Sequence, residues 1–190
     1  MSENQKKIWI TGASSGIGKA VAEKFAKEGW KVAVSARRKE LLDELAQNQN
    51  IVSFPLDVTN NNQINEVFKN ILTEFKDLDI CLFSSGTYEP KDELSIDPDK
   101  IRNVINVNFL GVIDCVKTVE DYFKNKKSGH ISIVSSIAGY RGLPNSSGYG
   151  PSKAALTNFS ESIYFDFKKF GVRVSIVSPG FIKTPLTDKN

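Results

Sequence analysis

The sequence predicts an α/β fold in which a doubly wound parallel sheet of six strands forms one domain over residues 1–190. Short apolar runs rich in β-branched residues alternate with helical patterns along the whole chain. Near-continuous apolar strands separated by helices indicate a parallel sheet that is covered on both faces. A glycine-rich stretch also joins the first apolar run to the first helical pattern, which is typical of a Rossmann-like arrangement. Strands are expected at residues 8–10, 32–34, 51–54, 80–83, 131–134 and 172–177, and helices at 17–28, 39–47, 63–75, 100–123 and 152–170.

The composition is that of an ordinary globular protein, and it excludes several classes. Of the 190 residues 40% are hydrophobic, and the dispersed net charge of +3 does not indicate a nucleic-acid-binding surface. No apolar stretch is long enough to cross a membrane, and the polar N-terminus does not resemble a signal peptide. Cys81 and Cys115 lie in apolar surroundings, so we expect buried thiols in a reducing compartment and a cytoplasmic location.

Histidine is informative because the chain contains only His130. Zinc sites built from several histidines are therefore excluded, and no metal is predicted. A Ser-His-Asp hydrolase would depend on this one residue, and the chain has no G-x-S-x-G turn to supply its serine. We expect His130 to be an ordinary residue at the edge of a strand.

The first strand leads into the turn Thr11-Gly12-Ala13-Ser14-Ser15-Gly16-Ile17-Gly18. Backbone N–H groups and the helix dipole make such a turn suitable for binding phosphate. The nucleotide pattern G-x-x-x-x-G-K-[ST] fails, because Ala13 and Ala20 stand at its first and last positions. The observed pattern, G-x-x-x-G-x-G after a threonine, resembles that of the short-chain dehydrogenase/reductase family. The resemblance implies dinucleotide contacts by Gly12, Ser14, Ser15, Gly16, Ile17 and Gly18.

The second strand ends in Ser35-Ala36-Arg37-Arg38, with no acidic residue before Glu40. A site for NAD would place an Asp or Glu near this point to bind the ribose 2′-hydroxyl. An arginine instead suits a 2′-phosphate, because its guanidinium offers a fork of donors and a fixed charge. We therefore predict that Arg37 binds the 2′-phosphate of NADP, helped by Ser14 or Ser15, while the other arginine begins the next helix. NAD is the less favoured cofactor.

The resemblance continues at the ends of the third and fourth strands. Asp57-Val58 stand where the family contacts the adenine, although Asp57 also suits a cap of the following helix. The two roles are compatible. After the fourth strand the family commonly carries Asn-Asn-Ala-Gly, whereas this chain reads Phe83-Ser84-Ser85-Gly86. Only Gly86 is retained, and the resemblance implies that it lies close to the cofactor.

Asn108 and Gly111 interrupt the helical pattern at 100–123. A polar residue and a glycine inside a helix both lower its stability, so some local irregularity is expected there. Asn106 competes with Asn108 on sequence alone. The resemblance favours Asn108 as the family's catalytic asparagine, whose backbone helps to hold a water in a proton path.

The most specific pattern is Tyr149-Gly150-Pro151-Ser152-Lys153, which begins thirteen residues after Ser136. A tyrosine and a lysine four residues apart lie on the same side of a helix. A nearby ammonium favours the phenolate, so Lys153 is expected to lower the pKa of Tyr149 toward neutrality. Tyr149 then acts as the acid/base, Ser136 orients a carbonyl oxygen by a hydrogen bond, and Lys153 also holds the nicotinamide ribose, as in the family.

Two further segments are assigned by the resemblance. The segment between Ser136 and Tyr149 borders the substrate, which makes Tyr140, Arg141 and Leu143 candidates for substrate contact; a loop with several glycines could instead be simply mobile. The sixth strand leads to Pro179, Gly180, Ile182 and Thr184, which match the family's contacts to the nicotinamide side of the cofactor. Family members usually continue into a substrate-covering loop, a helix and a strand, so the C-terminal part of the family fold is apparently absent.

The sequence thus predicts an NADP-dependent oxidoreductase that transfers a hydride between the cofactor and a carbonyl or secondary alcohol. Two alternatives stay open, a catalytically silent dinucleotide-binding regulatory protein and, more weakly, a phosphotransferase. The Tyr149–Lys153 pair argues against the first, because binding alone does not require it.

The chain is also expected to form a homo-oligomer, a dimer or tetramer. The last helix carries an apolar stripe, and Tyr164 and Phe165 lie outside it, which indicates a second buried face. Alternatively, the missing C-terminal part covers these aromatic residues. The stripe consists of Leu156, Phe159, Ile163, Phe167 and Phe170.

Overall fold

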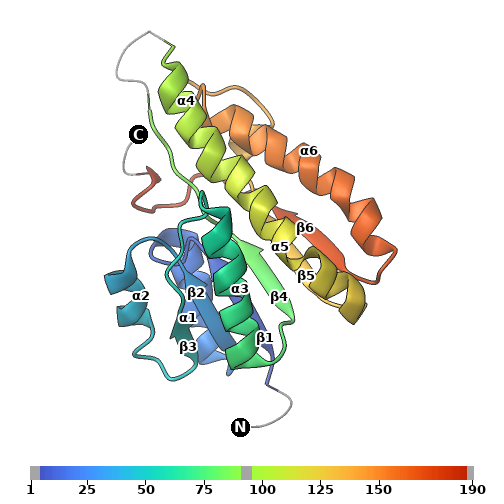
Figure 1. Ribbon diagram of the computed structural model, residues 1–190. Helices are drawn as coiled ribbons and strands as arrows, with labels where there is room; N and C mark the ends of the chain where they lie inside the picture. Colours follow the sequence, from blue (N-terminus) through green and yellow to red (C-terminus); the bar gives the residue numbers. More distant parts are fainter. Residues whose placement is uncertain (1–4, 91–95, 188–190) are drawn as a thin grey trace.

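Six parallel strands form one sheet in the order β3-β2-β1-β4-β5-β6. The computed structural model describes residues 5–90 and 96–187, and Figure 1 shows their arrangement. All six predicted strands are confirmed, with boundaries within one residue of those expected. The strands are β1 (Lys7–Thr11), β2 (Lys31–Ser35), β3 (Ile51–Ser53), β4 (Ile80–Phe83), β5 (His130–Val134) and β6 (Arg173–Val177).

The strand order reverses between β1 and β4, which are both next to one another and parallel. At such a switch point the connections from the two strands run in opposite directions and leave a crevice at the carboxyl ends. The turn after β1 and the loop after β4 both lie at this edge. The fold therefore places the predicted phosphate-binding turn where a ligand of a doubly wound sheet binds.

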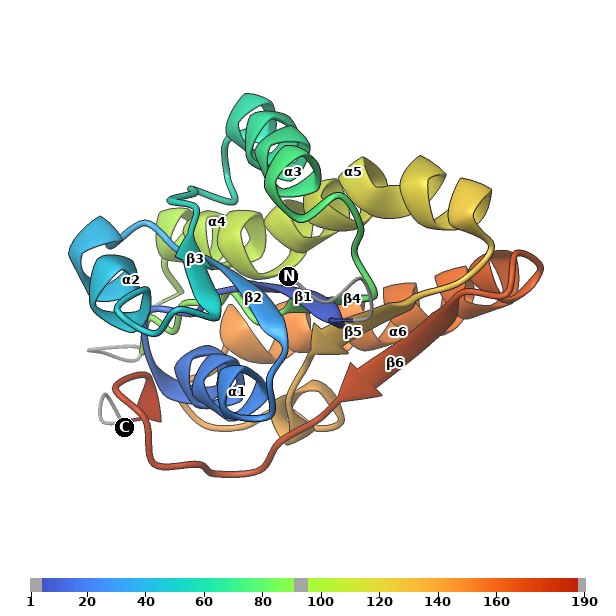
Figure 2. The same cartoon turned by 90° about the horizontal axis from the view of Figure 1, so that it is seen from below.

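Helices cover both faces of the sheet, and each face has its own apolar core. Figure 2 shows α1 on one side of the sheet and α3 and α5 on the other. The larger core lies between the sheet and α3, α5 and α6, and Trp9 and Phe83 are buried in it. The helices are α1 (Gly16–Lys27), α2 (Lys39–Leu45), α3 (Asn61–Phe75), α4 (Pro98–Ile105), α5 (Gly111–Lys126) and α6 (Tyr149–Lys168). None of the helices in the described part of the chain is both long enough and apolar enough to pass through a membrane.

The helix expected at 100–123 is divided in two. A π-helical turn, Asn106–Leu110, separates α4 from α5, so the irregularity expected at Asn108 and Gly111 is found. A Cβ on Gly111 would lie 2.7 Å from the carbonyl oxygen of Val58, which explains the glycine at the start of α5. The wider turn ends where the chain must pass close to the loop after β3.

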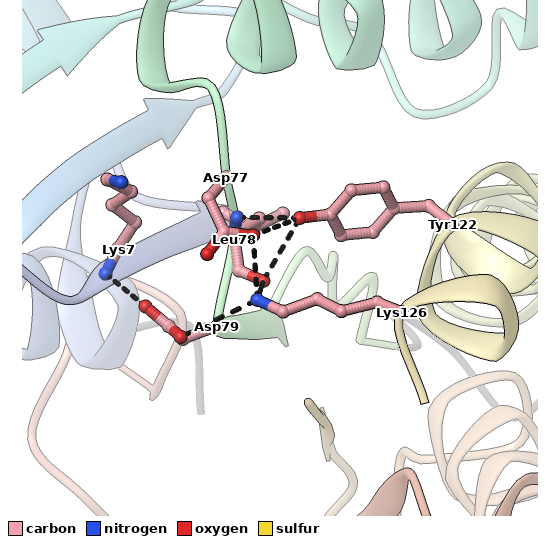
Figure 3. A network of polar contacts seen from close by, with 6 residues as sticks. All are labelled: Lys7, Asp77, Leu78, Asp79, Tyr122 and Lys126. Atoms are coloured by element: carbon pink, nitrogen blue, oxygen red, sulfur yellow. Dashed lines mark hydrogen bonds and ion pairs between the residues drawn. The ribbon is translucent and has the colours of Figure 1, made fainter. Parts of the chain in front are cut away.

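A polar network fastens α5 to the opposite end of the sheet from the crevice (Figure 3). The Tyr122 hydroxyl donates to Asp77 Oδ1 at 2.5 Å and accepts from the Leu78 N–H at 2.8 Å. Lys126 Nζ donates to the same Asp77 oxygen at 2.7 Å and to the Leu78 carbonyl at 2.8 Å. Asp79 Oδ2 accepts from the Lys7 backbone N–H at 2.8 Å, which ties β1 to the entry of β4. This network fixes the start of β4 beside β1, and the two strands pair in parallel from there to their carboxyl ends.

Cys81 and Cys115 are buried thiols, as expected. Burial, the larger cause, raises the pKa of each, so neither is a reactive thiolate. His130 is half-buried in β5, and its Nε2 lies 2.7 Å from Ser175 Oγ on β6. That pairing is a cross-strand contact of the kind expected for a histidine at the edge of a strand.

Candidate functional site

The glycine turn packs backbone to backbone against the loop that follows β4. Gly12 has φ +69°, and a Cβ there would lie 2.7 Å from the carbonyl carbon of Ser84. Ser84 Oγ donates to the Thr11 carbonyl at 2.5 Å and fastens the two segments together. A Cβ on Gly18 would lie 2.5 Å from the Gly12 carbonyl oxygen, so the helix N-terminus is drawn close under the turn. The result is an open cradle of backbone N–H groups at the start of α1.

Arg38, rather than Arg37, reaches the serines of this turn. Its Nη2 donates to Ser14 Oγ at 2.8 Å and to Ser15 Oγ at 2.9 Å, and its Nε reaches Ser14 Oγ at 3.2 Å. Arg38 is also the N-cap residue of α2, immediately before Lys39. Arg37 is exposed beside it and makes no hydrogen bond or ion pair to the rest of the described chain. The two guanidinium groups make the carboxyl end of β2 basic.

Asp57 is used by the turn that follows β3. Its Oδ1 accepts from the Thr59 N–H at 2.9 Å and from the Thr59 hydroxyl at 2.8 Å. Asn60, not Asp57, caps α3 by accepting from the Gln63 N–H at 3.2 Å. Asp57 therefore stabilises the approach to the cap, while Val58 is buried against Gly111.

Asn108 is fully buried and holds the loop after β4 in place. Its Oδ1 accepts from the Thr87 N–H at 2.7 Å, and its Nδ2 donates to the Thr87 carbonyl at 2.9 Å. The same Nδ2 donates to Ser152 Oγ on α6 at 3.1 Å. A Cβ on Gly86 would lie 3.6 Å from Asn108 Oδ1 and 3.7 Å from Lys153 Nζ. Asn108 thus links the β4 loop, the π-helical turn and α6 in one buried contact.

Ser136, Tyr149 and Lys153 come together where β5 and α6 meet. Ser136 Oγ accepts from the Ala138 N–H at 3.1 Å, which leaves its own proton to be donated elsewhere. Lys153 is 3% exposed and donates to the Val134 carbonyl at 2.9 Å. Its Nζ lies over the Tyr149 ring, 5.6 Å from the ring centroid. The predicted serine, tyrosine and lysine therefore form one cluster.

The pKa of Tyr149 differs from the expectation that Lys153 would lower it. The pKa of Tyr149 is raised rather than lowered: burial raises it most, a hydrogen bond with Ser136 lowers it, and Tyr88 raises it further. Burial lowers the pKa of Lys153 to about 8. The ammonium lies over the face of the ring and is bonded to Val134, so it does not stabilise a phenolate directly. Tyr149 is consequently a protonated acid at neutral pH.

An apolar hollow of about 300 Å³ opens beside this cluster. Ser136 and Tyr149 line it, together with other residues that carry hydroxyl groups. Of the three predicted substrate residues, only Leu143 lines the hollow. Tyr140 donates to Ser178 Oγ at 3.2 Å, and Arg141 is exposed. The remaining lining residues are Tyr88, Ile137, Ala138, Pro144, Ser146, Gly180, Phe181, Leu186 and Thr187.

The segment after β6 returns toward the glycine turn. The Pro179 carbonyl accepts from the Ile137 N–H at 3.1 Å, and Gly180 lines the hollow. A Cβ on Gly16 would lie 3.2 Å from Thr184 Cγ2. The Ile182 carbonyl accepts from the Thr187 hydroxyl at 2.8 Å. These contacts place 179–184 between the hollow and the turn.

Sequence reasoning missed several residues of this site. Tyr88 packs edge to face on Tyr149, with ring centroids 5.5 Å apart and planes at 77°. Arg38 was assigned to the helix start alone, and Ser152 was overlooked. Tyr88 follows a strand end at the crevice, and that position is the signal that could have found it.

The fold and the glycine cradle are those of a dinucleotide-binding α/β protein, and a buried tyrosine–lysine pair lies at the same edge of the sheet. The sequence model described as short chain dehydrogenase matches residues 6–190, and the chain belongs to that family.

Relatives and solved structures agree with this membership. The chain is 33% identical over 185 residues to the 3-oxoacyl-[acyl-carrier-protein] reductase FabG of Thermotoga maritima, covering 95% of this chain and 75% of the relative. It is 30% identical over 188 residues to an uncharacterized oxidoreductase of Staphylococcus epidermidis, covering 97% of this chain and 81% of the relative. The structure of ElxO with NADP bound superposes with a TM-score of 0.90 at 31% identity, over 97% of this chain and 77% of that one.

Proposed function

We propose that this chain is an NADP(H)-dependent oxidoreductase that interconverts a carbonyl compound and a secondary alcohol. One observation carries the proposal: Ser136 and Tyr149 face an apolar hollow, with Lys153 buried behind the tyrosine ring. Polar groups that converge on one wall of an apolar pocket beside a nucleotide cradle suit proton transfer to a small substrate. The nicotinamide would supply the hydride.

In this proposal each residue has a separate task. Tyr149 donates its phenolic proton to the carbonyl oxygen, and the raised pKa keeps that proton in place at neutral pH. Ser136 donates a second hydrogen bond to the same oxygen. Lys153 supports the tyrosine and holds the nicotinamide ribose. Asn108 fixes Thr87 and Ser152 on either side of the cluster, and its backbone supports the return of a proton from solvent.

The cradle fits a dinucleotide phosphate. Gly12, Gly16, Ile17 and Gly18 shape the turn, where side chains would collide with neighbouring backbone at Gly12 and Gly18. Asp57 and Val58 would border the adenine, Gly86 the ribose, and Pro179, Gly180, Ile182 and Thr184 the nicotinamide. Ser14, Ser15, Arg37 and Arg38 would take the 2′-phosphate. That ElxO binds NADP with the same fold supports this choice over NAD.

Removing either arginine should weaken binding of NADPH but not of NADH. A hydrogen bond to a charged group contributes about 1.5–3 kcal/mol, so Arg38→Ala should lower NADPH affinity roughly tenfold to a hundredfold. Arg37→Ala tests the assignment made from the sequence, and we expect a loss of the same kind from it. Titration calorimetry with both cofactors separates the effects. Unchanged NADPH affinity in both variants would exclude a 2′-phosphate site at the end of β2.

The proposed activity is tested by following NADPH consumption with a panel of neutral aldehydes and ketones. We expect turnover with NADPH that depends on the carbonyl compound and is slower with NADH. Binding of NADPH without turnover of any carbonyl or alcohol would favour the regulatory protein instead.

We further propose that the chain forms a homo-oligomer through α6. Phe165 is 66% exposed and Tyr164 36% exposed, and together with Val174 and Ile176 they line an apolar hollow on that helix and β6. Phe170 is 40% exposed beyond the end of α6 and does not join the buried stripe. Sedimentation of the wild type should show a dimer or tetramer, and Phe165→Glu should shift it toward the monomer. A wild-type monomer at micromolar concentration would contradict the assignment.

A further inference from the structure

Tyr88 stands at the point where three parts of the site meet. It is 6% exposed, lines the apolar hollow, and packs edge to face on the ring of Tyr149. Its hydroxyl donates to the Asn145 carbonyl at 3.4 Å, in a segment whose Pro144 and Ser146 also line the hollow. The preceding residue, Thr87, is held through both backbone groups by Asn108. The ring of Tyr88 is therefore a fixed wall and not a side chain that swings with its loop.

The described residues that line the hollow are uncharged. Besides Tyr88, their side chains are aliphatic, aromatic or hydroxyl-bearing, and no Asp, Glu, Lys, Arg or His of residues 5–90 and 96–187 is among them. Arg141 is exposed outside the lining, and Lys153 is buried behind Tyr149 with its ammonium bonded to the Val134 carbonyl. With the neutral nicotinamide of NADPH bound, a carboxylate entering this hollow would lose its hydration without gaining a cationic partner from the described residues that line it.

The volume of the hollow limits the size of the substrate. Pockets for small molecules range from about 300 to 1,000 Å³, and this one, at about 300 Å³, lies at the lower end. Because Gly180 lines the hollow and also borders the nicotinamide in the proposed function, the space left beside the cofactor has room for no more than one aromatic or branched alkyl group next to the reacting carbonyl. Tyr88 bounds that room on the side of Tyr149, and Leu143, Pro144 and Phe181 are among the residues that bound the rest.

We propose that Tyr88 is a specificity-determining residue, and that the site takes an uncharged aldehyde or ketone bearing one apolar group of about phenyl size while rejecting 2-oxo acids. This inference rests on the proposed oxidoreductase function and specifies its substrate class. The ring of Tyr88, more than its hydroxyl, sets the selection, because the ring provides the wall.

A matched pair of substrates tests the rejection of charge. Methyl benzoylformate and benzoylformate share the phenyl group and the ketone and differ in whether the neighbouring group is an ester or a carboxylate. With NADPH, we expect the wild-type kcat/KM for the ester to exceed that for the acid by at least about a hundredfold, because the acid must bury an unpaired charge. Equal kcat/KM values would overturn the proposal.

Variants of Tyr88 test whether its ring limits the size of the substrate. Tyr88→Phe keeps the ring and should therefore keep the wild-type preference between the phenyl and the naphthyl ester. Tyr88→Ala should raise the kcat/KM ratio of the naphthyl to the phenyl 2-oxo ester by at least about tenfold, since small changes in an apolar pocket alter discrimination by roughly 10- to 200-fold. Tyr88→Leu replaces Tyr88→Ala if the latter does not fold. An unchanged size preference in the folded variant would overturn the role of Tyr88.

A binding measurement keeps this inference separate from the proposed activity. Calorimetry on the wild type saturated with NADPH, whose nicotinamide is uncharged, compares methyl mandelate with mandelate, the alcohols related to the two substrates. We expect the ester to bind and the acid to bind at least about a hundredfold more weakly. If no carbonyl is turned over but the ester is still preferred, the proposed function fails and the specificity stands. If mandelate binds as well as its ester, the specificity fails even when turnover is observed.

Discussion

Tyr149→Phe is expected to reduce carbonyl turnover by roughly 10²- to 10⁴-fold, the usual contribution of general acid–base catalysis. The substitution removes one hydroxyl and keeps the ring that packs against Tyr88 and below Lys153. The fold should therefore be preserved, and NADPH affinity should change by less than about twofold. Steady-state kinetics and calorimetry on the same preparation measure both quantities.

Tyr122→Phe is the matched control, because it also deletes one phenolic hydroxyl. Tyr122 lies at the other end of the sheet, where its hydroxyl bonds Asp77 and the Leu78 N–H (Figure 3). This variant should lose about 1–3 kcal/mol of stability, because the Leu78 N–H and the Asp77 carboxylate lose a partner. Its turnover should match the wild type. If Tyr149→Phe retained wild-type activity, Tyr149 would not be the acid.

Lys153→Met is expected to lose turnover and, at the same time, to change how stability depends on pH. Burial of the ammonium, which lowers the pKa of Lys153 from 10.5 to about 8, destabilises the folded protein by about 3 kcal/mol below pH 8, at about 1.4 kcal/mol per tenfold change in proton concentration. Between pH 8 and 10.5 Lys153 is protonated in the unfolded chain and neutral in the folded protein. The stability of the wild type therefore rises with pH over this range. Methionine carries no charge, and the variant has no such cost to relieve.

Tyrosines and cysteines also titrate in this pH range, but they do so in both proteins. The difference in stability between the wild type and Lys153→Met therefore isolates the effect of Lys153. Urea unfolding at pH 7 and pH 10 should show the wild type gaining about 2 to 3 kcal/mol relative to Lys153→Met over that interval. NADPH affinity should fall in the variant, because the ribose loses its lysine. A stability difference that does not vary with pH would mean that Lys153 is not held charged in a desolvated position.

The fold could be predicted because the strands of a buried parallel sheet are nearly continuous apolar runs. Ile80–Phe83 and Val32–Val34 have apolar side chains on both faces, and helices with clear polar faces separate them. The proximity of Tyr149 and Lys153 could be predicted because residues four apart on a helix lie on the same side of it. Ser136 followed from its position at the end of the neighbouring strand.

The remaining features depend on tertiary contacts that the local sequence does not contain. Arg37 and Arg38 are adjacent, and only the path of the chain after β2 decides which guanidinium meets Ser14. The expected effect of Lys153 on the pKa of Tyr149 failed because the ammonium bonds the Val134 carbonyl and lies over the ring face. The position of Tyr88 after a strand end could have pointed to it, but its packing on Tyr149 depends on Asn108, twenty residues further along the chain, which fixes its loop.

The most direct test of the proposed function is isotope transfer from the cofactor to the substrate. NADPH carrying deuterium at the transferable C4 position is incubated with the wild type and methyl benzoylformate, and the alcohol product is examined by mass spectrometry and NMR. We predict one deuterium at the carbinol carbon in the wild type, and a rate of incorporation at least about a hundredfold lower in Tyr149→Phe. Alcohol formed without deuterium, or no alcohol at all from protein saturated with NADPH and with every neutral carbonyl tested, would contradict the assignment of hydride transfer to this site.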